Sequence, residues 1–355
     1  MPEIKKYLKD LHRTNPAEAL RKGRMRLDMN EGVHGLPDGF VRSVAGKIDN
    51  KLMLTYPACA GLLKKIARHN GIRPENICLG NGSDGVIKYI FDAYISPNDK
   101  VLLTNPTFAM YPIYCRISDA KPVVIDYKPD LTFPFEEFIG KLKRGVKMAV
   151  VVNPNNPTGD VIDPDRMVYM IRHAAQNDIL MVVDEAYFYY YPETVIKLVA
   201  KYDNLIILRT FSKLCAMANV RIGYAAAAPS VIRNIKKVKP SFDVNGLAVL
   251  FTSELLDRPA IISAMTKKAR AGGDYLCRML KRAGIEHRGG NTNFILIKCG
   301  SRAGEIVKKL KSRGILVSGN FSQPFLKDYL RVTIGDKSQM AHFWKTFVSI
   351  WRRTK

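Results

Sequence analysis

The chain has 355 residues, of which 47% are hydrophobic and 25% charged, which is typical of a globular protein and is enough for two unequal cores. Its 56 lysines and arginines against 32 aspartates and glutamates give a formal net charge of +24. These basic residues are spread over predicted helical faces, without a zinc-finger pattern or a basic low-complexity tail, which argues against a nucleic-acid partner. No apolar run reaches the ~20 residues of a bilayer span and no signal peptide is recognisable, so we expect a cytoplasmic protein without a membrane partner.

The cysteine pattern is consistent with that location. None of the six cysteines belongs to a CxxC pair or lies near a histidine cluster; they are Cys59, Cys78, Cys115, Cys215, Cys277 and Cys299. The sequence therefore predicts neither a disulfide framework nor a metal site.

The amino-terminal part predicts little regular structure beyond two helices. Residues 1–24 favour an amphipathic helix and a polar connector, with Thr14-Asn15-Pro16 capping a second helical turn. A helix is expected over residues 60–69, directly after Tyr56-Pro57. His69 lies on this lysine-rich helix, and we expect it to be solvated rather than catalytic.

Residues 79–85, Leu-Gly-Asn-Gly-Ser-Asp-Gly, lead into another predicted helix. Small residues at a helix start allow backbone N–H groups to approach a phosphate at the positive end of the helix. Taken alone, the segment is equally typical of an ordinary glycine-rich turn.

From residue 77 to about 240 the chain alternates apolar strands with helical periods. The predicted strands cover residues 100–103, 122–126, 148–152, 179–183, 205–208 and 223–228. Such alternation predicts a mostly parallel sheet with helices on both faces. In α/β proteins of this kind, ligands bind at the carboxyl ends of the strands.

The strand at residues 205–208 is followed by an unusual set of polar groups. Thr210 and Ser212 provide hydroxyls, Lys213 provides an amine, and Arg221 lies eight residues further on. A desolvated lysine loses its proton more easily and can form an imine with an aldehyde, while Ser212 and Arg221 suit a dianionic phosphate. Pyridoxal 5'-phosphate carries both groups, which indicates Lys213 as its anchor; the alternative is a surface lysine at a helix start.

Two further strand ends fit the same cofactor. Asp184 ends a strand and could keep a pyridine nitrogen protonated, which makes the ring an electron sink, and Tyr187 would lie within reach of the ring hydroxyl. Residues 150–159 contain two prolines and a glycine that fix a turn, so that the amide of Asn156 can be held against the ring oxygen.

Beyond residue 240 the chain is expected to leave the sheet. Helices are predicted over residues 245–256, 260–283, 303–313 and 339–352, the last capped by Ser338, and strands over residues 294–297, 314–317 and 329–334. We divide the chain into an amino-terminal arm (1–35), a large domain (36–240) and a small domain (241–355). In the last strand Arg331 alternates with the apolar residues Leu330 and Val332. Its side chain is therefore expected either to face solvent or to bind a carboxylate.

With these segments in this order, the chain resembles a fold-type I pyridoxal-phosphate enzyme of the class I/II aminotransferase group, closest to its histidinol-phosphate aminotransferase branch. The residues that carry the resemblance are the Gly-Ser-Asp loop at 82–84, Pro106-Thr107-Phe108, residues 153–159, Asp184 to Tyr187, Ser212-Lys213, Arg221 to Gly223 and Leu330 to Thr333. They span about three quarters of the chain. The resemblance implies a three-layer α/β/α fold with a mostly parallel sheet and a smaller α+β domain.

The resemblance also implies roles for individual residues. Gly82, Ser83 and Asp84 would cap the cofactor phosphate, with Thr210, Ser212 and Arg221 beside it; Phe108 would stack on the pyridine ring; Asn30, Asn156 and Arg331 would contact substrate, Arg331 through a carboxylate. Tyr56 resembles a tyrosine that crosses to the neighbouring subunit's phosphate, which implies a homodimer with shared sites.

The predicted reaction is transamination in a biosynthetic pathway. Lys213 would hold the cofactor as a Schiff base and move a proton, with Asp184 and Tyr187 tuning the ring. The amino donor would be glutamate or a similar amino acid, and the acceptor a small carbonyl compound with or without a phosphate.

The sequence does not favour histidinol phosphate as the acceptor. Related enzymes usually carry an arginine after the strand resembling residues 314–317, whereas this chain has Ser318-Gly319-Asn320. Losing that contact would remove ~1.5–3 kcal/mol. Two alternatives remain: a decarboxylase of phosphoserine or phosphothreonine, which would use the same cofactor residues, and a basic nucleic-acid-binding protein on an inactive enzyme scaffold.

Overall fold

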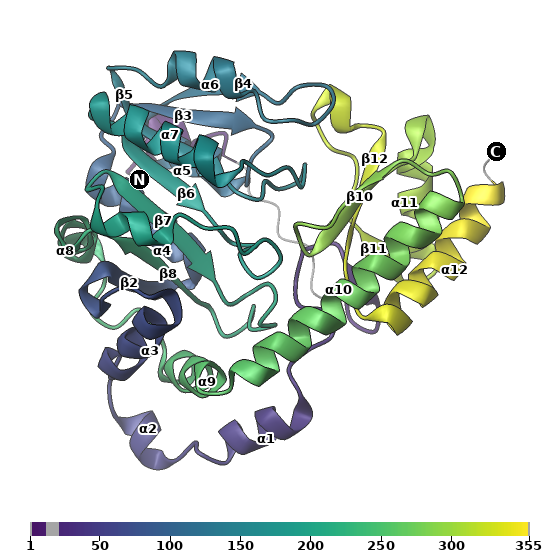
Figure 1. Ribbon diagram of the computed structural model, residues 1–355, viewed down its shortest axis with the longest axis horizontal. Coiled ribbons are helices and arrows are strands. Elements are labelled where there is room, and N and C mark those ends of the chain that lie inside the picture. The colour runs from purple at the N-terminus through teal and green to yellow at the C-terminus, as the bar shows by residue number, and fades with distance from the viewer. Residues whose placement is uncertain (1, 12–20, 354–355) are drawn as a thin grey trace.

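The computed structural model describes residues 2–11 and 21–353 (Figure 1). The predicted cap at Thr14-Asn15-Pro16 lies outside these residues. The predicted amino-terminal helix is wrong for residues 2–11, where a single 3-10 turn covers Lys6–Leu8. None of the residues of that turn is buried, and short helices without tertiary packing are marginal in water.

A seven-stranded sheet forms the larger part of the molecule, in the order β2-β8-β7-β6-β5-β3-β4 (Figure 1). Its strands are β2 (Ile77–Asn81), β3 (Lys100–Asn105), β4 (Lys121–Asp126), β5 (Val146–Val152), β6 (Leu180–Asp184), β7 (Leu205–Thr210) and β8 (Ile222–Ala227). Neighbours from β4 to β7 pair in parallel, while β8 pairs antiparallel with both β7 and β2. The predicted mostly parallel sheet is therefore confirmed.

Helices cover both faces of this sheet, as predicted. The surrounding helices are α1 (Asp38–Ala45), α2 (Asn50–Leu54), α3 (Ala60–Asn70), α4 (Gly82–Tyr94), α5 (Met110–Ile117), α6 (Phe135–Lys141), α7 (Pro164–Gln176), α8 (Pro229–Val238) and α9 (Gly246–Leu256). Residues of β6 alternate between two cores: Leu180 and Val182 pack with α4, α5 and α8, whereas Met181 and Val183 pack with α3, α6 and α7. This period of two is what a sheet buried on both faces requires.

Strand β2 was not among the predicted strands. Gly80 and Asn81 are turn-forming residues, and the local sequence therefore favoured a loop. Pairing with β8 places Gly80 opposite Gly223 and completes the edge of the sheet. The tertiary partner, rather than local propensity, makes this strand.

A second unit packs beside the large sheet and consists of short strands and helices (Figure 1). Its elements are β1 (Met25–Leu27), β9 (His287–Arg288), β10 (Phe294–Lys298), β11 (Ile315–Val317), β12 (Tyr329–Thr333), α10 (Pro259–Arg282), α11 (Ala303–Ser312) and α12 (Lys337–Arg353). Strand β1 pairs with β11, β12 pairs with β10, and a bridge between Ser318 and Arg331 joins the two groups. The amino-terminal segment thus becomes part of the carboxy-terminal unit.

The long helix α10 connects the two units. Ile262, Met265 and Ala269 pack in the core beneath the large sheet, whereas Leu276 and Leu280 pack in the core of the carboxy-terminal unit. The boundary between the two hydrophobic cores therefore lies within this helix. The sequence predicted a domain boundary earlier in the chain, at residue 240. The three-part division of the chain stays a prediction.

The structure corrects the predicted cap of the last helix. Ser338 was expected to cap it, but α12 begins at Lys337 and the side chain of Asp336 accepts the backbone N–H of Gln339 at 2.9 Å. The Gln339 side chain in turn accepts the N–H of Asp336 at 2.9 Å, which completes a reciprocal capping box. Within the described part of the chain, no helix combines the length and the apolar character that crossing a membrane requires.

Candidate active site

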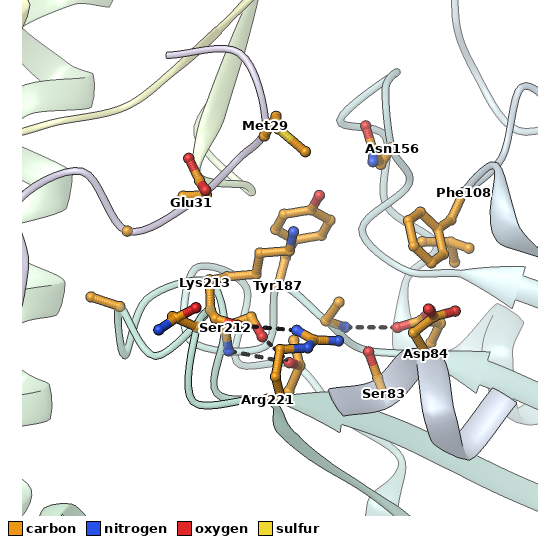
Figure 2. A pocket seen from close by; sticks show the side chains of 18 of the residues that line it. Met29, Glu31, Ser83, Asp84, Phe108, Asn156, Tyr187, Ser212, Lys213 and Arg221 are labelled. Atoms are coloured by element: carbon orange, nitrogen blue, oxygen red, sulfur yellow. Dashed lines mark hydrogen bonds between the residues drawn. The ribbon is translucent and has the colours of Figure 1, made fainter. Parts of the chain in front are cut away.

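A cavity of about 660 Å³ lies at the carboxyl ends of the parallel strands (Figure 2). Its walls come from the loops after β3, β5, β6 and β7, from the start of α4 and from the segment after β1. The lining residues are Arg26, Met29, Glu31, Gly32, Ser83, Asp84, Phe108, Val152, Asn156, Asp184, Ala186, Tyr187, Thr210, Ser212, Lys213, Ala216, Ala218, Asn219 and Arg221. This is the edge at which a parallel sheet binds ligands.

Lys213 occupies the middle of the cavity (Figure 2). It follows β7, and its Nζ lies 5.9 Å from the centre of the Tyr187 ring. Desolvation, assisted by the charge of Arg331, lowers the pKa of Lys213 to about 8, while Asp184 acts in the opposite direction. A substantial fraction of this amine is therefore neutral near physiological pH, and the neutral form is the nucleophile.

Asp184 ends β6 and is 2% exposed. Its Oδ2 accepts a hydrogen bond of 2.8 Å from the hydroxyl of Tyr111, and its Oδ1 accepts one of 3.1 Å from the backbone N–H of Ala186. Burial raises the pKa of Asp184 to about 6, and the two hydrogen bonds limit that rise. The carboxylate is thus largely ionised at neutral pH inside a site that excludes water.

The start of α4 and the loop after β7 form a cationic end of the cavity. Gly82 has φ of +75°, and a Cβ there would lie 2.5 Å from Nη2 of Arg221, so only glycine allows the arginine to approach. Ser83 follows in the first turn of the helix, and Ser212 lies across from it (Figure 2). Helix N–H groups, hydroxyls and a guanidinium together suit an anion such as a phosphate.

The opposite side of the cavity is built around Asn156 and Arg331. Nη1 of Arg331 donates to Oδ1 of Asn156 at 2.5 Å, and Nη2 donates to the carbonyl of Asp28 at 2.8 Å. Nε of Arg331 is buried without a partner among the described residues. Arg331 lies directly behind Asn156, which itself faces the cavity.

Asn30 supports Tyr187 from behind. Its Nδ2 donates to the Tyr187 hydroxyl at 2.9 Å, and its own backbone carbonyl accepts from Asn293 at 2.7 Å. Burial raises the pKa of Tyr187 to about 12, so the phenol remains protonated at neutral pH. Asn30 is 1% exposed and does not line the cavity, although the sequence placed it in contact with substrate.

Three residues around this site have a left-handed backbone conformation. Asn30, Ala216 and Arg221 have φ values of 55°, 52° and 60°, a region that residues with a side chain rarely adopt. The segment after β1 also packs tightly on the lysine loop, because a Cβ at Gly32 would lie 2.5 Å from Cβ of Ala216. Strain of this kind accumulates where a fold must hold functional groups in place.

Most of the residues singled out from the sequence come together here. Ten line the cavity: Ser83, Asp84, Phe108, Asn156, Asp184, Tyr187, Thr210, Ser212, Lys213 and Arg221. Gly82, Asn30 and Arg331 adjoin it through the contacts described above. Tyr56 does not: its side chain is 75% exposed and its ring stacks on Phe242 with the centroids 4.1 Å apart.

Sequence reasoning missed three groups. Tyr111 holds Asp184, and the hydroxyl of Tyr114 donates to Oδ1 of Asp84 at 3.1 Å. Both lie on α5, one turn apart and close after Phe108, so the spacing of the aromatic residues was the available signal. Arg26 also lines the cavity, but nothing in its local sequence marks it.

Residues 42–347 match the family model described as aminotransferase class I and II. The chain belongs to this family. This aminotransferase is 31% identical over 314 residues to the histidinol-phosphate aminotransferase of Caldanaerobacter subterraneus, with 88% of each chain covered. It is 32% identical over 338 residues to that of Clostridium novyi, with 94% of each covered. The predicted resemblance to the histidinol-phosphate branch is confirmed.

The fold of this aminotransferase is also that of solved relatives. The histidinol-phosphate aminotransferase of Sinorhizobium meliloti, in complex with pyridoxal-5'-phosphate, superposes with a TM-score of 0.91 at 22% identity and covers 100% of this chain and 99% of its own. At this level of identity the match establishes the shared fold.

Proposed function

We propose that Lys213 binds the cofactor of this aminotransferase, pyridoxal 5'-phosphate, and that the enzyme moves an amino group from glutamate or a similar amino acid to a small carbonyl acceptor. The observation that carries the proposal is one amine with a lowered pKa, flanked by a buried carboxylate and an anion-binding helix start in one cavity. These are the three groups that an aldehyde, a pyridine nitrogen and a phosphate on one molecule require.

The residues of the site fit this cofactor. At the phosphate end, a Cβ at Gly82 would collide with Arg221, and one at Gly223 would lie 2.4 Å from the backbone nitrogen of Ser83. The two glycines allow the helix start, β8 and the guanidinium to form one compact anion site. Phe108 lies at the side of the cavity, where an aromatic ring can cover a planar ligand (Figure 2).

When bound, pyridoxal phosphate supplies an aldehyde for amines and an aromatic ring that withdraws electrons from the bond to be broken. Lys213 Nζ, neutral in part at physiological pH, can accept a proton from the substrate α-carbon and return it elsewhere. The ionised Asp184 carboxylate would accept a hydrogen bond from a pyridinium N–H. The Tyr187 hydroxyl, which is protonated below about pH 12, can donate to a ring oxygen.

Arg331 and Asn156 orient the donor in this proposal. The guanidinium is held by Asn156 and by the Asp28 carbonyl, and its remaining N–H groups suit a carboxylate. Fixing the carboxylate fixes the direction of the other bonds at the α-carbon. Asn30 acts only indirectly, by holding the Tyr187 hydroxyl.

We further propose that the enzyme works as a homodimer. Apolar side chains are exposed together around α2 and the start of α9, with Met53 70%, Leu54 83%, Tyr56 75% and Phe242 56% exposed. A surface of this kind favours a protein partner. Tyr56 lies in this surface and outside its own cavity, so it is available to a second copy's site.

The test is a titration of the purified, cofactor-loaded enzyme with amino acids. Transamination predicts 2-oxoglutarate from glutamate, one per active site in the absence of an acceptor, with no carbon dioxide. Carbon dioxide from phosphoserine or phosphothreonine without formation of a keto acid would instead identify a decarboxylase. The relatives that match over most of the chain are named aminotransferases, and no feature of the cavity favours decarboxylation.

A further inference from the structure

One row of side chains crosses the short sheet of the carboxy-terminal unit. In the middle strand β10, Leu296 is the register partner of Arg288 in β9 and of Arg331 in β12. Residues directly opposite each other in antiparallel strands point to the same face, so these side chains leave the sheet on one side. Ile295 and Ile297, the neighbours of Leu296, are buried in the core of the carboxy-terminal unit, which therefore lies against the other face.

The face with the two arginines meets two loops of the larger part of the molecule. Leu296 packs with Leu131 in a small apolar cluster. Nη1 of Arg288 donates to the carbonyl of Asp130 at 2.8 Å, and Nη2 of Arg288 donates to Oδ1 of Asp160 at 2.8 Å. Arg288 thereby joins the loop after β4 and the loop after β5 to the carboxy-terminal unit.

Asp160 ends the turn that carries Asn156. The backbone N–H of Asn155 donates to the carbonyl of Asp160, and the N–H of Gly159 donates to the carbonyl of Asn155, each at 2.9 Å. The Asp160 side chain is 13% exposed, and its Oδ2 accepts the backbone N–H of Phe133 at 2.8 Å. Both carboxylate oxygens of Asp160 are therefore bound, and through the closed turn Asp160 restrains Asn156.

The two arginines of the row hold the two ends of this turn. Arg331 donates to Oδ1 of Asn156, and Arg288 binds Asp160 at the end of the turn. Asn156 lines the cavity, whereas Arg288 does not. A shift of the turn would redirect the Asn156 amide, and a misplacement of about 1 Å in an active site can lower a rate about a hundredfold.

We propose that Arg288 is a positioning residue of the active site: by binding Asp160 it holds the 155–160 turn against the small sheet, and it thereby keeps Asn156 in contact with Arg331 and directed into the cavity. This inference rests on the proposed function, in which Asn156 and Arg331 orient the donor. Arg288 acts only through the turn. Its planar guanidinium suits this role because it binds the carboxylate of Asp160 and the carbonyl of Asp130 at the same time.

The first measurement follows the turn itself in cofactor-free protein. Amide hydrogen exchange at Asn155 and Gly159 reports the two backbone hydrogen bonds that close the turn. In Arg288→Gln we expect these amides to exchange about tenfold faster, whereas the amides of β5 should keep their protection. Lys298→Gln is the matched control, because it breaks a salt bridge of 2.8 Å, to Glu286, on the same pair of strands. The exchange of the turn should not change in this control.

The second measurement uses the cofactor-loaded enzyme and determines whether Arg288 acts through Asn156. The values of kcat/KM for glutamate are compared for Arg288→Gln, Asn156→Ala and the double variant. We expect Arg288→Gln to lower kcat/KM about tenfold in the wild-type background, but less than about twofold where Asn156 is already alanine, because effects transmitted through one residue do not add. Lys298→Gln should react like the wild type.

Two conservative variants keep the test decisive if Arg288→Gln folds poorly. Arg288→Lys retains a cation beside Asp160 and should keep most of the wild-type kcat/KM. Asp160→Asn retains an oxygen for the backbone N–H of Phe133 but removes the charge that Arg288 binds. This variant should resemble Arg288→Gln in both measurements.

Unchanged exchange at the turn in Arg288→Gln would overturn the inference, because the turn would then hold without the arginine. An equal loss of kcat/KM in the wild-type and Asn156→Ala backgrounds would also overturn it, since Arg288 would then act on the protein as a whole. A wild-type enzyme that reacts with no amino acid would instead contradict the proposed function. The exchange measurement requires no reaction, so the two failures are distinguishable.

Discussion

The hydroxyl of Tyr111 donates a 2.8 Å hydrogen bond to Oδ2 of Asp184, joining α5 to the end of β6 inside the active site. Burial raises the pKa of Asp184, and this hydrogen bond is the largest effect that lowers it again, to about 6. Tyr111 is 1% exposed, so no water replaces the hydroxyl readily. Tyr111 therefore keeps the carboxylate ionised at neutral pH.

Replacing Tyr111 with phenylalanine should raise the pKa of Asp184 by about one to two units, since a hydrogen bond to a charged group contributes ~1.5–3 kcal/mol. A raised pKa means that Asp184 is protonated at higher pH than before. The acidic limb of the pH–rate profile for kcat should move from near 6 to between about 7 and 8. Tyr169→Phe, which removes a hydroxyl from a side chain that is 49% exposed, should leave the profile unchanged. An unshifted acidic limb in the Tyr111 variant would refute this role.

Arg331→Gln should have two separable effects. Loss of the guanidinium should lower kcat/KM for glutamate about ten- to hundredfold, because a charge-assisted carboxylate contact is lost. Removing a cation that disfavours the ammonium form should also raise the pKa of Lys213 above about 8. The second effect is measured as the pH dependence of Lys213 acylation in cofactor-free protein.

The control for that experiment is Arg313→Gln, a surface change whose side chain contacts Ser349. Neither kcat/KM nor the acylation profile should change in this variant. If Lys213 of Arg331→Gln were acylated at lower pH than in the wild type, the assigned sign of the interaction would be wrong.

Tyr56 offers a test of the shared active site. Tyr56→Phe and Lys213→Ala should each be nearly inactive as pure proteins if Tyr56 serves the partner's cofactor. In a mixed dimer, one site combines Lys213 from one chain with Tyr56 from the other. Mixing equal amounts after dissociation and reassociation should restore roughly a quarter of wild-type activity, since half of the dimers are mixed and each has one intact site.

No recovery in the mixture, with mixed dimers demonstrated by tagged chains, would place Tyr56 outside the partner's site. Leu54→Asp provides an independent check of the interface, because Leu54 is 83% exposed. This charge should shift the sedimentation of the protein toward the monomer and lower activity in parallel. A dimer of unchanged affinity would exclude α2 from the interface.

The pair of Arg209 and Glu185 stabilises the sheet directly behind the site. Both side chains are 4% exposed, Nη2 of Arg209 lies 2.8 Å from Oε2 of Glu185, and its guanidinium lies 3.4 Å from the centre of the Phe188 ring. Arg209→Met leaves a buried carboxylate unpaired, which should lower the free energy of unfolding by ~3–5 kcal/mol in urea titrations. The exposed change Arg313→Met should alter it by about 0.5 kcal/mol or less. A loss below about 1 kcal/mol for Arg209→Met would show that Glu185 finds other partners.

The large sheet could be predicted because its signal is local. Strands such as β5 and β6 are almost entirely apolar and lead into polar residues, which defines both a buried strand and its ligand-binding edge. For the same reason Asp184 and Lys213 were identified, since Asp184 ends such a strand and Lys213 lies just beyond another. The start of α4 was identified from its small residues.

Features that depend on distant partners could not be predicted. Strand β2 exists because β8 pairs with it, and Asn30 faces Tyr187 because the segment after β1 is held by Asn293 and Thr333. Arg26 reaches the cavity only because β1 joins β11, almost 300 residues later in the chain. Sequence periodicity contains no information on such pairings.

Every step of the proposed function requires Lys213 as the amine that binds the cofactor. The most direct measurement is borohydride reduction of the purified, cofactor-loaded enzyme, followed by proteolysis and mass spectrometry of the labelled peptide. We predict a stable pyridoxyl label on Lys213 and its absence in Lys213→Ala. A label on another lysine, or a protein that binds the cofactor but acquires no label, would contradict the account.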